Sequence, residues 1–158
     1  MKKNIIICGL CVLLVIVLIS VPIAIILSNP LRRSEEKIRE SILEITPIGM
    51  DMEEVLEIIE KNKKWEVADI EHEYGYEIID GIPYYNYSDQ GDNIVGSKSI
   101  RGFVGKYTGE YDSLERFWEE GITAALYLFF ETYVEVYWGF DENSKLIDVC
   151  VWKYTNAI

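Results

Sequence analysis

Apolar positions recur at helical spacing in two short stretches on either side of residue 48. In the first, Ile38, Ile42 and Ile45 fall on one stripe, with charged residues on the rest of the surface. Ser34 precedes this stripe and can cap a helix there, while Pro47 breaks the pattern. The spacing predicts a short amphipathic helix that ends before residue 47.

A second helix is predicted to start at Asp51, after Gly49. Asp51 can act as an N-cap, and Glu54 stands three residues further on, where a capping box places an acid. One apolar face then follows, formed by Met52, Val55, Ile58 and Ile59. The two helices therefore form a corner, with one apolar face each to bury.

From Trp65 onward the spacing changes from helical to alternating. The pattern predicts strands at residues 65–74, 97–107, 126–140 and 146–154, the last two joined as a hairpin by the turn at 141–145. Residues 75–97 are rich in Gly, Asp, Asn and Tyr and are predicted to be a long loop. The predicted fold class is α+β: two short helices packed on one face of an antiparallel sheet of about four strands, in two layers.

Two stretches carry a family resemblance. The helix start "TPIGMDMEEV" and the closing hairpin "VYWGFDENSKLIDVCVW" resemble those of small α+β domains of the BamE/SmpA type. The likeness covers residues 45–65 and 134–153, and the chain also resembles uncharacterised small membrane-anchored bacterial proteins. The resemblance implies a small α+β fold and a supporting role in envelope assembly. Members of that family are lipoproteins, whereas this chain lacks a lipobox.

The N-terminal segment has a composition of its own. Residues 5–27 carry no charge, and 23 helical residues would reach roughly 35 Å, enough to cross a bilayer core. The segment predicts a single-pass transmembrane anchor at 1–28, with the lipid bilayer as its partner, followed by one soluble domain at 29–158. The basic residues on the two sides of the segment favour opposite orientations in the membrane. The short charged N-terminus favours a cell-membrane protein whose soluble domain is extracellular.

The net charge and the available side chains argue against several classes of function. The formal net charge of −12 repels phosphates and so argues against nucleic-acid binding. His72 is the only histidine, no P-loop or nucleophile elbow occurs, and the acidic loops at 89–93 and 141–145 do not have EF-hand spacing. Cys150 lies in an apolar alternating stretch that is typical of a buried cysteine. The sequence predicts no enzyme activity, no cofactor and no metal.

Tyrosine supplies the candidate site. The chain holds 11 Tyr and 4 Trp, and a loop at 83–87 reads "PYYNY". Tyrosine beside Asn and Ser is typical of adaptable protein-binding loops, although the rings could instead fold back over the sheet. The predicted protein-binding residues are Tyr84, Tyr85, Tyr87 and Tyr133.

Three functions remain open. The first is a membrane-anchored, non-catalytic protein-interaction domain of the bacterial cell envelope, with an unidentified protein partner. The second is an inhibitor or immunity-type module that binds a basic enzyme. The third is an enzyme that uses the carboxylates of Glu131 and Glu135, which share one face of a predicted strand.

Overall fold

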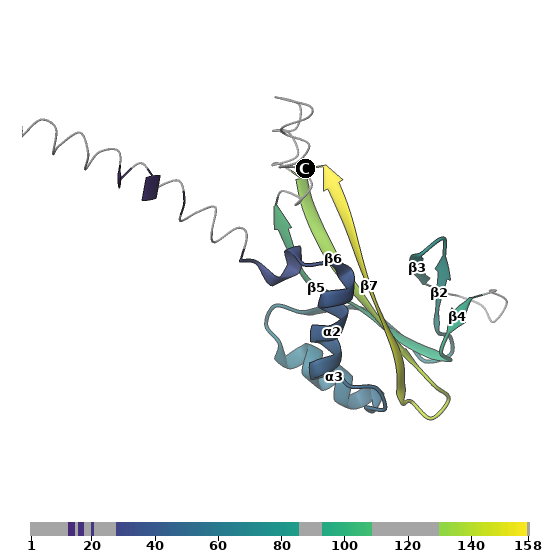
Figure 1. Cartoon of the computed structure of the whole chain (residues 1–158). Helices are drawn as coiled ribbons and strands as arrows, with labels where there is room; N and C mark the ends of the chain where they lie inside the picture. The colour runs from purple at the N-terminus through teal and green to yellow at the C-terminus, as the bar shows by residue number, and fades with distance from the viewer. Residues whose placement is uncertain are drawn as a thin grey trace, which may run out of the picture.

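A computed structural model describes residues 28–85, 93–108 and 130–157, together with Leu13, Leu14, Ile16, Val17 and Ser20. Within these residues the chain forms two antiparallel sheets, two short α-helices and one 3-10 turn (Figure 1). The 3-10 turn η1 (Pro30–Arg32) leads into helix α2 (Glu35–Ile45), and helix α3 (Met52–Lys61) follows.

The larger sheet has four strands in the order β1-β5-β6-β7. Each neighbouring pair of strands is antiparallel, and β6 lies between β5 and β7. The bounds are β1 (Glu66–Glu71), β5 (Lys98–Thr108), β6 (Phe130–Phe140) and β7 (Leu146–Ala157). Helices α2 and α3 both cover one face of this sheet, here called the inner face (Figure 1).

The main core lies between the helices and the inner face. Alternation along β6 turns every second side chain toward the helices, because successive residues of a strand point to opposite faces. The buried residues of this core come from both helices and three strands: Ile38, Ile42, Met52, Val55, Ile59, Ile100, Val104, Tyr107, Val134, Val136, Trp138, Phe140, Leu146, Val149 and Val151.

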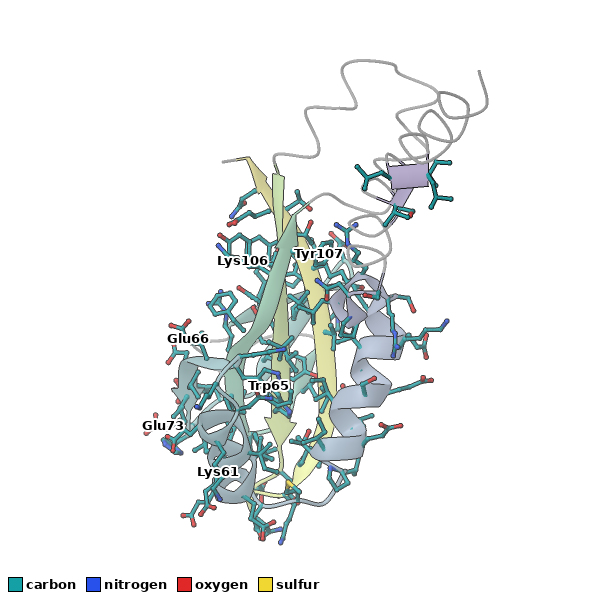
Figure 2. The ribbon with its side chains drawn as sticks, turned by 90° about the vertical axis from the view of Figure 1, so that its left-hand side faces the viewer. Lys61, Trp65, Glu66, Glu73, Lys106 and Tyr107 are labelled. Carbon is teal, nitrogen blue, oxygen red and sulfur yellow. The ribbon has the colours of Figure 1, made fainter. Side chains whose placement is uncertain are left out.

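Trp138 is the largest side chain that is fully buried in this core. Its indole N–H donates to the Thr46 hydroxyl at 3.1 Å, and that hydroxyl donates to the Ile42 carbonyl at 3.0 Å, at the end of α2. The ring also packs against Trp65, with centroids 6.2 Å apart. Figure 2, which views the helix side, shows Trp65 between α3 and α2. Gly102 on β5 lies against the Trp138 ring, and a Cβ added at this glycine would come within 3.2 Å of the indole.

The corner between the helices is joined to the β6–β7 hairpin. The Gly49 N–H donates to the Leu146 carbonyl at 2.7 Å, and the Leu146 N–H donates to the Met50 carbonyl at 2.8 Å. Gly49 has φ of +91°, a conformation that glycine adopts without strain. Asp51 binds Lys145 at 2.7 Å and makes no side-chain cap to α3, so the capping box predicted from Asp51 and Glu54 is absent at this helix end.

The second sheet has three short strands in the order β3-β2-β4. They are β2 (Tyr76–Ile79), β3 (Ile82–Tyr85) and β4 (Ile94–Val95). Asp80 and Gly81 join β2 to β3 with φ of 51° and 79°, the two positive values that a two-residue hairpin turn requires. This sheet lies on the side of the larger sheet away from the helices (Figure 1).

Tyr76 holds the small sheet against the large one. Its ring is fully buried and lies 5.6 Å from the Tyr137 ring, between centroids. An added Cβ on Gly139 would come within 3.0 Å of the Tyr76 ring, so the close approach needs glycine at that position. The Tyr76 hydroxyl donates to Asp148 Oδ2 at 2.9 Å.

The predicted fold class is wrong. The chain is mostly sheet, with seven strands in two sheets among the described residues, instead of one sheet of about four strands. The error lies in residues 75–97, which were predicted to be a loop and which supply β2, β3 and β4. Their strands are too short to show an alternating pattern.

The transmembrane anchor is also corrected. Crossing a bilayer takes about 20 helical apolar residues, whereas α2 has 11 residues and α3 has 10. In the part of the chain that the structure describes, no helix is long and apolar enough to cross a membrane. The predicted N-terminal transmembrane helix, the single-pass cell-membrane localisation and the extracellular orientation are corrected with it. Apart from five residues, the predicted span at 5–27 lies outside the described residues.

Replacing Thr46 tests the contact with Trp138. Thr46→Val leaves the buried indole N–H without an acceptor, so we expect the free energy of unfolding to fall by about 1–3 kcal/mol. Urea denaturation followed by tryptophan fluorescence measures it. Ser41→Ala is the control, because the Ser41 hydroxyl only bonds the Lys37 carbonyl on the surface of α2. Equal losses in the two variants would mean that the indole bond contributes nothing specific.

Candidate aromatic binding face

The outer face of the large sheet carries the candidate site. Residues that pair directly across neighbouring strands share a face, so the pairing identifies which side chains lie together. Tyr133 pairs with Tyr154 and Lys106, and Glu135 pairs with Trp152 and Phe103. We call the four rings on this side the aromatic face: Phe103, Tyr133, Trp152 and Tyr154.

Three rings of the aromatic face contact one another, across β6 and β7 and along β7. Tyr133 stacks on Tyr154 with centroids 5.4 Å apart and planes 12° apart. Trp152 stacks on Tyr154 at 5.1 Å. All four rings are partly exposed. Tyr133, Tyr154 and Trp152 therefore form a connected aromatic surface that is held in place by its own contacts and is still open to solvent.

An ion pair between a buried carboxylate and a half-buried guanidinium lies among these rings. Glu135 is only 1% exposed, and both of its oxygens accept from Arg101: Nη2 to Oε1 at 2.7 Å, and Nε to Oε2 at 3.2 Å. The Tyr137 hydroxyl also donates to Oε2, at 2.9 Å. The Arg101 guanidinium lies over the Phe103 ring, 5.8 Å from its centroid. The pair therefore orients the rings around it as well as neutralising a buried carboxylate.

This environment shifts the tyrosine pKa values upward. Burial is the main cause for Tyr137, and the Glu135 charge adds to it, so the pKa of Tyr137 lies well above its usual range. The pKa of Tyr154 is raised for the same two reasons, burial first. Both hydroxyls stay protonated at physiological pH, so they act as hydrogen-bond donors.

A second ion pair on the same face is exposed. Lys106 Nζ binds Glu131 Oε2 at 2.8 Å, and the Tyr133 hydroxyl donates to the same oxygen at 2.8 Å. The Lys106 hydrogen bond lowers the pKa of Glu131, and the Tyr133 hydrogen bond acts in the same direction. Lys106 also lies over the Tyr133 ring, 5.5 Å from its centroid. Lys106 and Glu131 are therefore each paired with an opposite charge on the same face.

A hollow of about 370 Å³ adjoins the aromatic face where β5 bulges between Phe103 and Gly105. Gly105 has φ of 143° at this bulge. Figure 2 shows Lys106 and Glu66 at the margin of the sheet here, with Tyr107 alongside Lys106 on β5. The lining residues are Lys64, Glu66, Phe103, Gly105, Lys106 and Tyr133.

The four tyrosines of the predicted site do not form one cluster in the described structure. Tyr133 lies on the aromatic face, whereas Tyr84 lies on β3 of the small sheet and is 45% exposed. Tyr85 ends β3, and Tyr87 lies outside the described residues. Trp152, Tyr154 and Phe103 were missed as site residues. The alternation of 146–154 places Trp152 and Tyr154 on one face and could have indicated them.

The other candidate groups make local contacts in the described structure. Glu135 is held by Arg101 and Glu131 by Lys106, so neither carboxylate is a lone acid in a cleft. Asp141 accepts the Lys145 N–H at 2.8 Å within its turn. No group of three or more potential metal ligands occurs among the described residues.

Comparison with known proteins adds no relative: no family model, no curated protein and no solved structure matches the chain. The resemblance to BamE/SmpA-type domains therefore stays a prediction from the two sequence stretches. The structure brings parts of those stretches together, through the backbone bonds of Gly49, Met50 and Leu146.

Replacing Arg101 tests the buried ion pair. Arg101→Met leaves the Glu135 carboxylate buried without its cation, and we expect a loss of about 3 kcal/mol or more in the free energy of unfolding. Lys106→Met removes the cation of the exposed pair on the same face and should cost less than about 1 kcal/mol. Urea denaturation of both variants gives the comparison. Similar small losses would show that Arg101 does not hold Glu135.

The reactivity of Cys150 gives a pH-dependent test. Burial, with help from the Asp148 charge, raises the pKa of the Cys150 thiol to about 11 from its ordinary 9.0. Only the thiolate reacts, so at neutral pH alkylation should be about a hundredfold slower than for a free thiol and should rise with pH toward 11. Iodoacetamide labelling followed by mass spectrometry, in a Cys8→Ser/Cys11→Ser chain, measures the midpoint. A midpoint below 9 would contradict the burial argument.

Proposed function

We propose that this chain is a non-catalytic protein-binding module whose partner docks on the aromatic face. One observation carries the proposal: four partly exposed rings lie together on one sheet face, around a guanidinium that is fixed by a buried carboxylate. Tyr, Trp and Arg are the residues that most often dominate binding energy at protein interfaces.

The rigidity of the face supports binding by contact. Stacked rings lose little conformational freedom when a partner covers them, since each ring already has a fixed neighbour. Arg101 is held at both ends of its planar group by Glu135. A surface of this kind favours a partner that brings apolar or aromatic side chains to meet it.

The charge balance of the face supports the same proposal. Arg101 and Glu135 neutralise each other, as do Lys106 and Glu131, although the whole chain has a formal net charge of −12. Contact with the rings and their two internal ion pairs therefore depends little on salt.

The predicted tyrosine site remains part of the proposal in reduced form. Tyr133 belongs to the aromatic face, and the exposed Tyr84 of the small sheet is a second contact point. The resemblance to BamE/SmpA-type domains also supports a role in holding other proteins.

Site-specific photo-crosslinking tests the proposal in the cells that produce the protein. A benzophenone amino acid replaces Tyr133, Trp152 or Tyr84 in turn, and Glu57 on the exposed surface of α3 is the control position. We expect Tyr133 and Trp152 to give the same cross-linked protein and Glu57 to give none. Mass spectrometry of the adducts identifies the partner.

Two results would count against the aromatic face. Adducts from Tyr84 alone would move the binding site to the small sheet, and identical adducts from Glu57 would indicate non-specific capture. With the partner purified, Trp152→Ala should weaken binding at least about tenfold, the effect expected of an interface hot spot.

A further inference from the structure

The two edge strands of the large sheet, β7 and β1, differ in whether other side chains cover their backbone. Along β7, side chains of α2 occupy backbone groups: Arg39 Nε donates to the Val149 carbonyl at 2.6 Å, and the Lys153 N–H donates to Glu35 Oε1 at 2.9 Å. Arg39 also binds Asp148 at 2.7 Å, which fixes the helix across the edge. An added strand on this side would have to displace α2.

The opposite edge, β1, has no such cover. β1 pairs with β5 on one side, and no described strand pairs with it on the other. The backbone N–H of Ile70 donates to the Asp69 carboxylate at 2.9 Å, which is a side chain of the same strand. An edge of this kind can accept another strand, because a partner's carbonyl can replace the local acceptor.

Three side chains on the outer side of β1 are acidic, and a bulge at Ala68, between Val67 and Asp69, separates the first of them from the other two. Glu66 pairs with Phe103, Asp69 with Arg101 and Glu71 with Ser99, so the three carboxylates continue the outer face of the sheet. None of the three forms an ion pair within the described part of the chain. After the bulge, a strand laid beside Asp69, Ile70 and Glu71 would place every second side chain next to the two carboxylates.

The inner side chains of β1 are apolar. Val67 packs against the core, and Ile70, which pairs with the buried Ile100, is still 37% exposed. An apolar side chain on the same face of a neighbouring strand would cover Ile70. The edge is therefore acidic on one face and apolar on the other.

We propose that β1 binds an extended segment of a partner protein in which basic and apolar residues alternate. Next to the regular part of β1, basic residues lie beside Asp69 and Glu71 and an apolar residue covers Ile70. Glu66 and Val67 precede the bulge and lie out of step with this alternation. Backbone hydrogen bonds hold the segment, and the alternation sets its register, because a shift of one residue would bring basic side chains onto the apolar face. The net charge of −12 speeds the approach of such a segment.

This inference rests on the proposed function, since both need a protein partner, and the two sites adjoin. Glu66, at the start of β1, lines the hollow together with Phe103 and Tyr133 of the aromatic face. A segment on β1 therefore lies next to the surface on which the body of the same partner rests.

Peptide binding to the full chain tests the edge directly. The probe is an octapeptide of alternating Lys and Val, and its control has the same residues in two blocks, Lys then Val. NMR titration of the isotope-labelled chain should show shift changes centred on β1 with the alternating peptide, and intermolecular contacts along the strand. Equal changes with the block peptide, or changes spread over all acidic surfaces, would overturn the proposal.

Charge variants separate the edge from net charge. Glu66→Gln, Asp69→Asn and Glu71→Gln together should weaken the alternating peptide about tenfold, as expected for exposed cross-strand pairs at Asp69 and Glu71 with the charge of Glu66 nearby. Glu53→Gln, Glu57→Gln and Glu60→Gln on α3 remove the same charge and should leave binding nearly unchanged. Equal weakening would mean that net charge alone attracts the peptide, which overturns the proposal.

Ile70→Lys gives an independent variant, because a lysine on an edge strand opposes pairing. It should abolish peptide binding while the fold is kept, since Ile70 is partly exposed. Failure of the edge and failure of the proposed function remain distinguishable. If these variants bind the partner as before and still cross-link from Tyr133 and Trp152, the edge proposal is wrong and the aromatic face stands.

Discussion

The hydrogen bond from Trp138 to Thr46 joins the two layers of the molecule. Trp138 lies on the central strand β6, and Thr46 ends α2 immediately before the corner that leads to α3. The indole ring therefore ties the end of α2 to the sheet, and Gly102 leaves room for the ring on β5. With the inner face fixed in this way, alternation along β6 directs Tyr133, Glu135 and Tyr137 to the outer face.

The outer face follows a different chemistry from the core. At its centre is the carboxylate of Glu135, which is shielded from water. Its hydrogen bonds therefore come from neighbouring side chains: Arg101 donates to both oxygens and Tyr137 donates to one. Replacing the pair with apolar residues could fold equally well. A buried ion pair is weak evidence of stability, but it does fix where a guanidinium and its neighbouring rings lie. This is the property that a binding surface needs.

The sequence predicted individual elements better than their arrangement. Helices at 35–45 and 52–61 follow from the spacing of Ile38, Ile42, Val55 and Ile59, because that spacing is local information. The small sheet was missed, since β2 and β3 have four residues each and Asp80-Gly81 was treated as loop composition instead of a hairpin turn. The outward position of Tyr133 follows from alternation along its own strand. That Trp152 and Phe103 lie near it does not follow, because pairing between strands depends on the register set by the hairpin and by the bulge near Gly105.

The cover that α2 places over β7 limits how the protein can assemble. A sheet with two open edges can grow without end, as each added copy offers a new edge. Here Arg39 and Glu35 occupy one edge of the large sheet, so β1 is the open edge of that sheet among the described strands. Two copies that paired through β1 would bring their acidic side chains together, and the large sheet would then have no edge left for a third copy. The same helix that completes the core therefore also prevents the sheet from extending into a fibre.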